Sequence, residues 1–221
     1  ADLPANVAAA AEVGVSLDLL RRYLDKRSIF DFLAGIRASG ERAARIVTNM
    51  LQFSRCSESQ RQPTQVPELL DRAVELAAND SALKKKFDFR HIEIVREYHP
   101  ALKPELLATI EIEQVMLNLL KNSAHALIEG TDPAPPRITL RAWPEGDWAV
   151  LQVADNGCGM TEAVRKRVFE PFFTTKEVGM GTGLGLAVSY MIITNNHHGT
   201  IAVESAPGQG TTFTIRLPLA R

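Results

Sequence analysis

The sequence predicts an α+β fold of the two-layer sandwich type: a mixed, mostly antiparallel sheet covered by helices and preceded by a helical segment. Two pairs of alternating strand patterns flank turn-forming residues at Pro144–Asp147 and Ala206–Gly210. An amphipathic helical pattern precedes the first pair, and a glycine-rich stretch separates the two pairs. Because the composition becomes polar near residue 60, we expect a helical part over residues 1–60 and the sandwich over residues 61–221.

The helical part contains a long apolar seam. Between Asp31 and Arg55, apolar or small residues recur at steps of four and three, a period that belongs to a helix packed in a bundle or coiled coil. Gly35 and Gly40 weaken such a helix by about 1 kcal/mol each, so packing has to hold it. Residues 1–28 are alanine-rich and are also expected to be helical. The seam consists of Phe32, Ile36, Ser39, Ala43, Ile46, Met50 and Phe53, widened by Leu33, Val47 and Leu51.

The elements of the sandwich follow in chain order. The polar segment Ser57–Pro63 ends in proline and predicts a linker, and the basic run Lys84–Lys86 is expected on a solvated face. Helices are expected at Val66–Ala78, Ile112–Ile128 and Ala187–Ile193. The second of these would bury Ile112, Val115, Met116, Leu119, Leu120 and Leu127. Strands are expected at Ile92–Val95, Arg137–Trp143, Trp148–Ala154, Thr200–Ser205 and Thr211–Leu217.

Composition argues against several classes of function. The chain has 25 basic and 26 acidic residues, so it lacks the basic excess of a nucleic-acid-binding protein. Cys56 and Cys158 form no CxxC pair, which argues against a disulfide framework or a thiolate zinc site and favours a reducing compartment. No apolar run approaches the roughly 20 residues that span a bilayer. The chain opens without Met and is expected to be a fragment, which leaves room upstream for a membrane anchor or sensor.

The helix before the first strand pair carries the first candidate site. Asn118, Asn122 and His125 are spaced by four and three residues, so they share a face at the edge of the apolar stripe. Asparagine is unfavourable inside a helix, and its amide oxygen is a hard ligand suited to Mg²⁺ and its waters. Solvent-facing or otherwise satisfied amides are the alternative interpretation.

A second candidate site follows an apolar strand. Asp155 comes at the strand end, and Gly157 and Gly159 follow it, where backbone can approach a flat ligand closely. The carboxylate can accept a hydrogen bond from an exocyclic amine such as that of adenine. The alternative is an ordinary Asn-Gly turn.

Residues 179–186 form a glycine-rich loop that leads into a helix, so its backbone N–H groups can turn toward an anion. The loop is neither a P-loop nor a dinucleotide fingerprint, and a flexible surface loop is the alternative. Before it, three phenylalanines surround Pro171 and indicate an apolar hinge of a mobile segment, from which Lys176 could reach a terminal phosphate. Core packing of the phenylalanines and a solvated lysine remain the alternative.

The order and spacing of these motifs resemble those of the sensor histidine kinases, within the superfamily that includes gyrase, Hsp90 and MutL. The match covers residues 64–219, and residues 41–55 are similar to the second helix of that family's dimerisation domain. The motifs that carry the resemblance are residues 114–122 for the N box, 155–160 for the G1 box, 169–173 for the F box and 181–186 for the G2 box.

The resemblance implies a Bergerat-type fold and a site for Mg-ATP. Asn122 would bind Mg²⁺, Asn118 would support the phosphates and the water shell of the metal, and Asp155 would bind the adenine amine. Gly157 and Gly159 would admit the purine, and His125 stands where many relatives carry a basic residue near phosphate. The predicted nucleotide-binding set is Asn118, Asn122, His125, Asp155, Gly157, Gly159, Phe169, Lys176, Gly181, Thr182, Gly183, Leu184 and Gly185.

The resemblance further implies phosphoryl transfer from ATP to a histidine, and from there to an aspartate of a response regulator receiver domain. It also implies a homodimer formed through the helical bundle of the dimerisation domain, and a cytoplasmic location with membrane contact only through upstream segments. The five histidines do not match the acceptor motif of the family, so residues 1–60 are expected to be a partial dimerisation domain whose acceptor lies upstream of Ala1. His197 and His198 are expected at a solvent-facing turn.

Three alternatives remain. An ATP-hydrolysing machine would need a glutamate at the place of Asn118, whose amide cannot take a proton from water. A serine kinase of the anti-sigma factor type lacks the helical bundle that the seam indicates. A nucleotide-binding scaffold without transfer activity stays open for this fragment, because it lacks a matching acceptor histidine.

Overall fold

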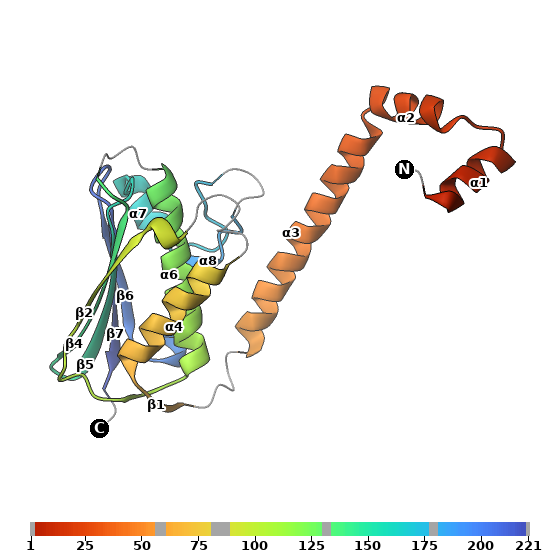
Figure 1. The fold of residues 1–221 in the computed structure, drawn as a ribbon. Coiled ribbons are helices and arrows are strands. Elements are labelled where there is room, and N and C mark those ends of the chain that lie inside the picture. The colour runs from red at the N-terminus through yellow and green to blue at the C-terminus, as the bar shows by residue number, and fades with distance from the viewer. Residues whose placement is uncertain (1–2, 56–60, 81–88, 130–133, 177–180, 220–221) are drawn as a thin grey trace. The chain divides into compact units, whose positions relative to one another are not determined.

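The computed structural model describes residues 3–55, 61–80, 89–129, 134–176 and 181–219, without the side chains of residues 41–42, 45–55 and 129. The chain divides into two compact units, residues 1–48 and 49–221, which we describe separately (Figure 1). None of the described helices is both long enough and apolar enough to cross a membrane.

The first unit is helical, as predicted. It contains α1 (Pro4–Glu12), α2 (Leu17–Lys26) and the long α3 (Ile29–Arg55), whose last residues belong to the second unit. Neither α1 nor α2 contains a buried residue, and the seam side chains Phe32 and Ile36 are 65% and 69% exposed. Within this unit the apolar seam therefore lies open. The seam side chains of Ile46, Met50 and Phe53 fall outside the described part.

The second unit is built on a five-stranded sheet with the order β2-β4-β5-β7-β6. β2 (Glu93–Tyr98) runs parallel to β4 (Arg137–Glu145), and every other neighbouring pair is antiparallel. β5 (Trp148–Asp155), β7 (Thr211–Pro218) and β6 (Thr200–Ser205) complete the sheet. This arrangement confirms the predicted α+β class with a mixed, mostly antiparallel sheet.

Helices cover one face of this sheet (Figure 1): α4 (Val66–Asn79), α6 (Thr109–Glu129) and α8 (Gly185–Met191). The alternating residues of β4 that point to this face, Ile138, Leu140 and Ala142, are fully buried. They meet the apolar stripe of α6, in which Ile112, Val115, Met116, Leu119 and Leu120 are all fully buried. The stripe therefore fixes which side of α6 faces the sheet.

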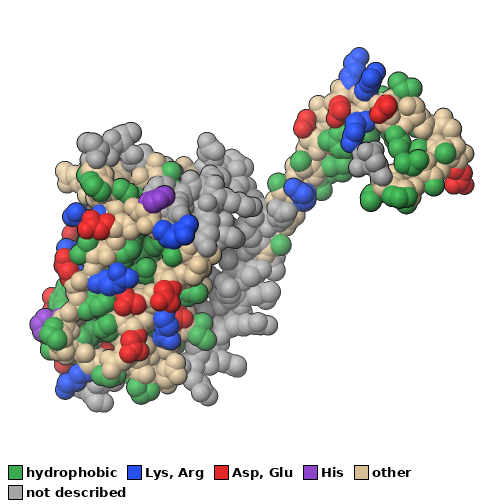
Figure 2. Space-filling view, viewed as in Figure 1, with side chains coloured by type: hydrophobic (Ala, Val, Ile, Leu, Met, Phe, Trp, Pro, Cys, Tyr) green, Lys and Arg blue, Asp and Glu red, His purple; other side chains and the backbone are tan. Residues whose placement is uncertain are grey.

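Charged side chains of both signs are interspersed over the face of this unit that Figure 2 shows. Several form ion pairs between neighbouring strands, such as Arg137 with Glu93 at 2.8 Å. Pairs as exposed as this one contribute only about 0–1 kcal/mol each, so stability has to come from the apolar layer between helices and sheet.

Some boundaries differ from the prediction. Gln62 and Pro63 belong to the strand β1 (Gln62–Thr64), not to a linker, because β1 pairs with β3 (Glu105–Leu107) in a separate two-stranded sheet. Leu127 is half-buried rather than buried, because it lies in the last turns of α6. The predicted strand at residues 92–95 extends to Tyr98. Residues 57–60 of the predicted linker and the basic run 84–86 lie outside the described residues.

Three short elements carried no clear sequence signal: the single-turn helix η2 (Phe89–His91), the strand β3 and the helix α7 (Glu162–Arg167). α7 begins at Thr161, whose hydroxyl accepts a hydrogen bond from Val164 N at 3.4 Å. The last turns after α8 widen into a π-helix (Ile192–Asn196), which the sequence does not distinguish from an ordinary helix.

The apolar layer predicts a contrast between two isoleucines on one turn of α6. Ile112 is fully buried and Ile110 is 77% exposed, so Ile112→Ala removes packed atoms and leaves a cavity, whereas Ile110→Ala does not. We expect Ile112→Ala to lower the free energy of unfolding by about 2–5 kcal/mol and Ile110→Ala by about 0.5 kcal/mol or less, measured by urea titration. Equal losses for the two variants would contradict the packing described for α6.

Candidate functional site

The side of α6 next to the buried stripe carries the polar residues that the sequence singles out. Asn118, Asn122 and His125 are all half-buried, as the spacing predicts. Ser123, beside Asn122, is only 1% exposed and was not predicted as a site residue. A serine on a stripe otherwise made of apolar residues is the signal that could have identified it.

Asp155 lies at the end of β5 and is 8% exposed. Its Oδ1 accepts hydrogen bonds from the backbone N–H groups of Gly157 at 3.0 Å and Thr211 at 3.2 Å. Its Oδ2 accepts one from the Ser123 hydroxyl at 2.8 Å. Three segments of the chain therefore orient one buried carboxylate, and none of them supplies a positive charge.

Burial raises the pKa of the Asp155 carboxyl group, because a desolvated carboxylate is disfavoured. The hydrogen bonds from Ser123, Gly157 and Thr211 act in the opposite direction and lower it. A carboxylate oxygen can accept two hydrogen bonds, and among the described residues Oδ2 accepts only the one from Ser123. Asp155 thus keeps one acceptor position for a donor from outside the chain.

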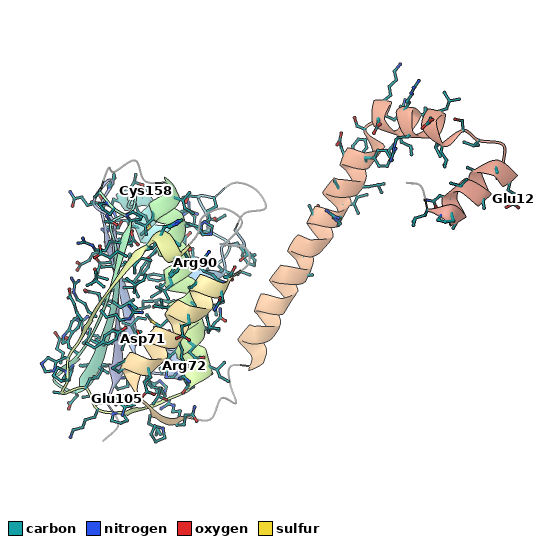
Figure 3. All side chains as sticks on the ribbon, viewed as in Figure 1. Glu12, Asp71, Arg72, Arg90, Glu105 and Cys158 are labelled. Carbon is teal, nitrogen blue, oxygen red and sulfur yellow. The ribbon has the colours of Figure 1, made fainter. Side chains whose placement is uncertain are left out.

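Gly157 and Gly159 follow this carboxylate, and the protein's own packing requires both to be glycine. A Cβ on Gly157 would come within 2.7 Å of the backbone carbon of Ala126 on α6. Gly159 has φ +66°, and a Cβ there would overlap the carbonyl oxygen of Ala206. Cys158 between them, labelled in Figure 3, donates its backbone N–H to Ala126 O at 3.1 Å. Their predicted role in admitting a purine stays a prediction.

The side chain of Asn118 connects α6 to the end of the glycine-rich loop by hydrogen bonds. Its Nδ2 donates to Gly185 O at 3.1 Å and to the hydroxyl of Ser189 at 3.3 Å, both in α8. Its Oδ1 accepts from Gln114 Nε2 at 3.1 Å. The amide predicted to support phosphates therefore also holds the start of α8 against α6.

The glycines of this loop differ in what surrounds them. Gly183 has φ +66°, and a Cβ there would overlap the backbone of Phe172. A Cβ on Gly181 would approach Thr174 Oγ1 to 2.9 Å, which a small rotation of that side chain relieves. A Cβ on Gly185 would lie 3.6 Å from Asn118 Cγ, an ordinary contact distance. Nothing in the described part of the protein requires glycine at 185, where its absent side chain leaves the face of the Asn118 amide open.

Asn122 Oδ1 accepts a hydrogen bond from Lys176 Nζ at 3.3 Å. The structure thus brings together two residues that the sequence predicts separately, one for a metal and one for a phosphate. The amide oxygen faces an ammonium group, so it lies in a position that accommodates positive charge.

The phenylalanines before the loop have different roles. Phe169 is half-buried and packs against the exposed Tyr190 and the buried Phe213, with ring centroids 5.4 and 6.4 Å apart. Phe172 is 59% exposed and has φ 66°. Leu184 of the loop is buried, and its backbone N–H donates to Thr182 Oγ1 at 3.4 Å.

The expectation of a solvent-facing turn is wrong for His197 and right for the exposed His198. His197 is 3% exposed, because the π-helix turns it inward toward Glu111 at the start of α6, with Nε2 3.3 Å from Glu111 Oε2. Burial lowers the pKa of the His197 imidazole, and Glu111 opposes this. Asn196 Nδ2 donates to the same Glu111 oxygen at 3.0 Å, and His197 Nε2 makes no hydrogen bond among the described residues.

Comparison with known proteins assigns the chain to a family. Residues 108–221 match the family described as histidine kinase-, DNA gyrase B-, and HSP90-like ATPase. The chain is 37% identical over 199 residues to the sensor kinase CckA of Brucella abortus, covering 86% of this chain and 20% of that protein. It is 35% identical over 176 residues to the signal transduction histidine-protein kinase AtoS of Escherichia coli, covering 79% of this chain and 27% of that protein. The chain thus spans about a fifth to a quarter of these relatives.

Two solved structures are similar in fold. Full-length ShkA in complex with AMPPNP has a TM-score of 0.66 at 26% identity, covering 86% of this chain and 38% of that one. The nucleotide-free catalytic domain of histidine kinase ThkA has a TM-score of 0.57 at 25% identity, covering 72% of this chain and 96% of that one.

The environment of Asp155 predicts an unusual effect on stability. Because its folded pKa is raised, the group favours the fold below its unfolded pKa, and this contribution is lost as the pH rises through the folded pKa. Asp155→Asn keeps an acceptor for Gly157 and Thr211 without a buried charge. We therefore expect its melting temperature at pH 7 to equal or exceed that of the wild type, with the difference shrinking as the pH falls through the folded pKa and vanishing below the unfolded pKa of about 4.

Asp71→Asn is the matched control, because Asp71 is a half-exposed aspartate bonded to Arg96 at 2.7 Å and to the Tyr98 hydroxyl at 3.1 Å. Neutralising it should lower the free energy of unfolding at pH 7 by up to about 1 kcal/mol. Strong destabilisation by Asp155→Asn at pH 7 would mean that the Asp155 charge supports the fold, contrary to the effect expected from its burial.

Proposed function

The chain belongs to the histidine kinase-, DNA gyrase B-, and HSP90-like ATPase family and carries the ATP-binding catalytic domain of a sensor histidine kinase, and from this we propose that it binds Mg-ATP for phosphoryl transfer to a histidine. The histidine would lie in a dimerisation domain of the same protein, and an aspartate of a response regulator would receive the group from it. Because the chain spans 20% and 27% of CckA and AtoS, these partners are proposals for the whole protein.

The observation that carries the nucleotide assignment is the buried carboxylate of Asp155. A desolvated carboxylate is unfavourable unless it is well bonded, and among the described residues no cation forms an ion pair with it. Its orientation by Ser123, Gly157 and Thr211 leaves one acceptor position on Oδ2. The amino group of adenine is a donor of the kind that such a position binds, whereas a purine with an oxo group in that place would be repelled.

Asn122, Lys176 and Gly185 would hold the phosphate end. A Cβ at position 185 would meet the Asn118 amide first, at an ordinary contact distance of 3.6 Å, so the absence of a side chain there leaves space next to this amide. Asn122 Oδ1 already accepts from a cationic group, so the same oxygen is suited to Mg²⁺, and Lys176 would then bond to phosphate instead. When bound, Mg-ATP supplies the phosphoryl group and the metal charge that offsets its negative charge.

The residues present also suit transfer rather than hydrolysis. The amide of Asn118 cannot accept a proton from water, and its Nδ2 and Oδ1 are bonded to α8 and Gln114. The domain would then work by aligning the nucleotide and excluding competing water reactions, while the acceptor imidazole comes from the dimerisation domain.

We also propose the division of the chain that its sequence predicts: residues 1–60 as a partial dimerisation domain and residues 61–221 as the catalytic domain. The exposed seam of α3 supports homodimerisation through a helical bundle, because such a surface needs a partner helix. The cytoplasmic location stays a prediction.

Incubation with γ-labelled ATP and Mg²⁺ tests the function directly. We expect no label on this chain, and label on a version extended upstream through the acceptor helix, stable to base and labile to acid. The Asp155→Asn variant of the longer version should lose most of the label because it binds ATP at least about tenfold more weakly. Acid-stable label would indicate a serine kinase, and ATP binding without label on either version would indicate a nucleotide-binding scaffold.

Substitutions at two glycines of the loop distinguish an effect on ligand binding from an effect on protein packing. Gly185→Ala adds a Cβ at ordinary contact distance and raises helix propensity, so the melting temperature should stay the same or rise. The same Cβ fills the space beside Asn118, so we expect Mg-ATP affinity in calorimetry to fall about tenfold or more.

Gly183→Ala is the contrasting variant, since positive φ and overlap with Phe172 should lower the melting temperature itself. Unchanged ATP affinity in Gly185→Ala would remove this loop position from the proposed site.

A further inference from the structure

We propose that Ser189 is a positioning residue of the phosphate-binding region: its buried hydroxyl, through Asn118, fixes the spacing between the glycine-rich loop and α6. This inference rests on the proposed function, because it concerns the same nucleotide site. Ser189 lies on α8, outside the motifs that the sequence pattern singles out.

The hydroxyl of Ser189 is shared between two partners. It donates to Gly185 O at 2.9 Å and accepts from Asn118 Nδ2 at 3.3 Å. Ser189 is fully buried, so water cannot replace either partner without rearrangement of the helix. A hydroxyl has one hydrogen to donate, and bonding it to Gly185 O leaves its lone pairs facing Asn118.

The orientation of the Asn118 amide follows from its partners. Gly185 O can only accept, so the amide group that faces it must be the NH₂. Gln114 Nε2 donates to the opposite end of the amide, Oδ1, which is compatible with this orientation. The amide nitrogen thus faces two acceptors of α8, Gly185 O and Ser189 Oγ.

These bonds connect the two elements that would bind phosphates. Asn118 stands one turn before Asn122 on α6, and Gly185 is the first residue of α8, directly after the loop. Removing the Ser189 hydroxyl takes away one of the two acceptors that the Asn118 amide nitrogen has on α8, and it is the fully buried one. The amide would then turn toward other partners, and the open face beside Gly185 would lose its defined shape.

If Ser189 acts only on the phosphate-binding region, its loss should affect the two ends of the nucleotide differently. The adenine end depends on Asp155, Ser123, Gly157 and Thr211, none of which contacts Ser189 through a hydrogen bond in the described structure. Loss of the Ser189 hydroxyl should therefore weaken the binding of the triphosphate and leave the binding of adenosine unchanged.

Calorimetry of the full chain with Mg-ATP and with adenosine tests this inference on Ser189→Ala. We expect the dissociation constant for Mg-ATP to rise about five- to tenfold, and that for adenosine to stay within about twofold of the wild type. In the Asn118→Ala background, Ser189→Ala should have no further effect on Mg-ATP binding, because the two residues act as one unit.

Thr194→Ala is the matched control. Thr194 makes the same kind of bond four residues back along this helix, from Oγ1 to Tyr190 O at 2.9 Å, but it is only half-buried and has no hydrogen bond to Asn118 in the described structure. It should bind both ligands like the wild type.

The outcomes separate this inference from the proposed function. Wild-type affinities for both ligands in Ser189→Ala would overturn the role of Ser189 and leave ATP binding intact. Equal losses for Mg-ATP and adenosine, with a lowered melting temperature, would overturn it in favour of a general structural role. Failure of the wild-type chain to bind Mg-ATP would refute the proposed function and this inference with it.

Discussion

Burial of the apolar stripe of α6 against the sheet is the interaction on which the candidate site depends. Five side chains of that stripe are fully buried, from Ile112 to Leu120, so the helix can present only one side to the sheet. At 3.6 residues per turn, this choice places Asn118 and Asn122 on the adjoining side, facing α8 and Lys176. A rotation that moved them would expose the stripe, at a loss of about 1.5–3 kcal/mol for each large side chain.

Side-chain hydrogen bonds then determine how the end of β5 and the start of α8 are positioned against α6. Ser123 links it to Asp155 at the end of β5, and Asn118 links it to the first turn of α8. Each such bond contributes only about 0.5–1.5 kcal/mol net, so these bonds do not drive folding. Their value is that a buried polar group without its partner is costly, which excludes arrangements in which α8 or the end of β5 is displaced.

The buried Asp155 and the glycine at 185 each lower the stability of the folded protein, at two positions of the proposed nucleotide site. A desolvated carboxylate raises the free energy of the folded state at neutral pH, yet it provides an acceptor that an uncharged side chain would not match. Glycine at 185 gives up helix propensity although the packing would admit a side chain. Gly157, Gly159 and Gly183 are different, because their neighbours in the protein leave no room for a Cβ.

By itself the sequence determined the fold class, the long helix α3 and most strands, because periodicity and turn residues are local in the chain. Motif spacing is local too, and it singled out the motif residues Asp155, Asn122 and Lys176. Only the tertiary structure decided that Pro63 pairs in β1, that His197 is buried beside Glu111, and that Ser123 bonds to Asp155 and Ser189 to Asn118. Each of these depends on partners that are distant in sequence: Asn118 and Ser189 are 71 residues apart. Such pairs meet only when the apolar stripe of α6 packs against the sheet, and no local pattern records them.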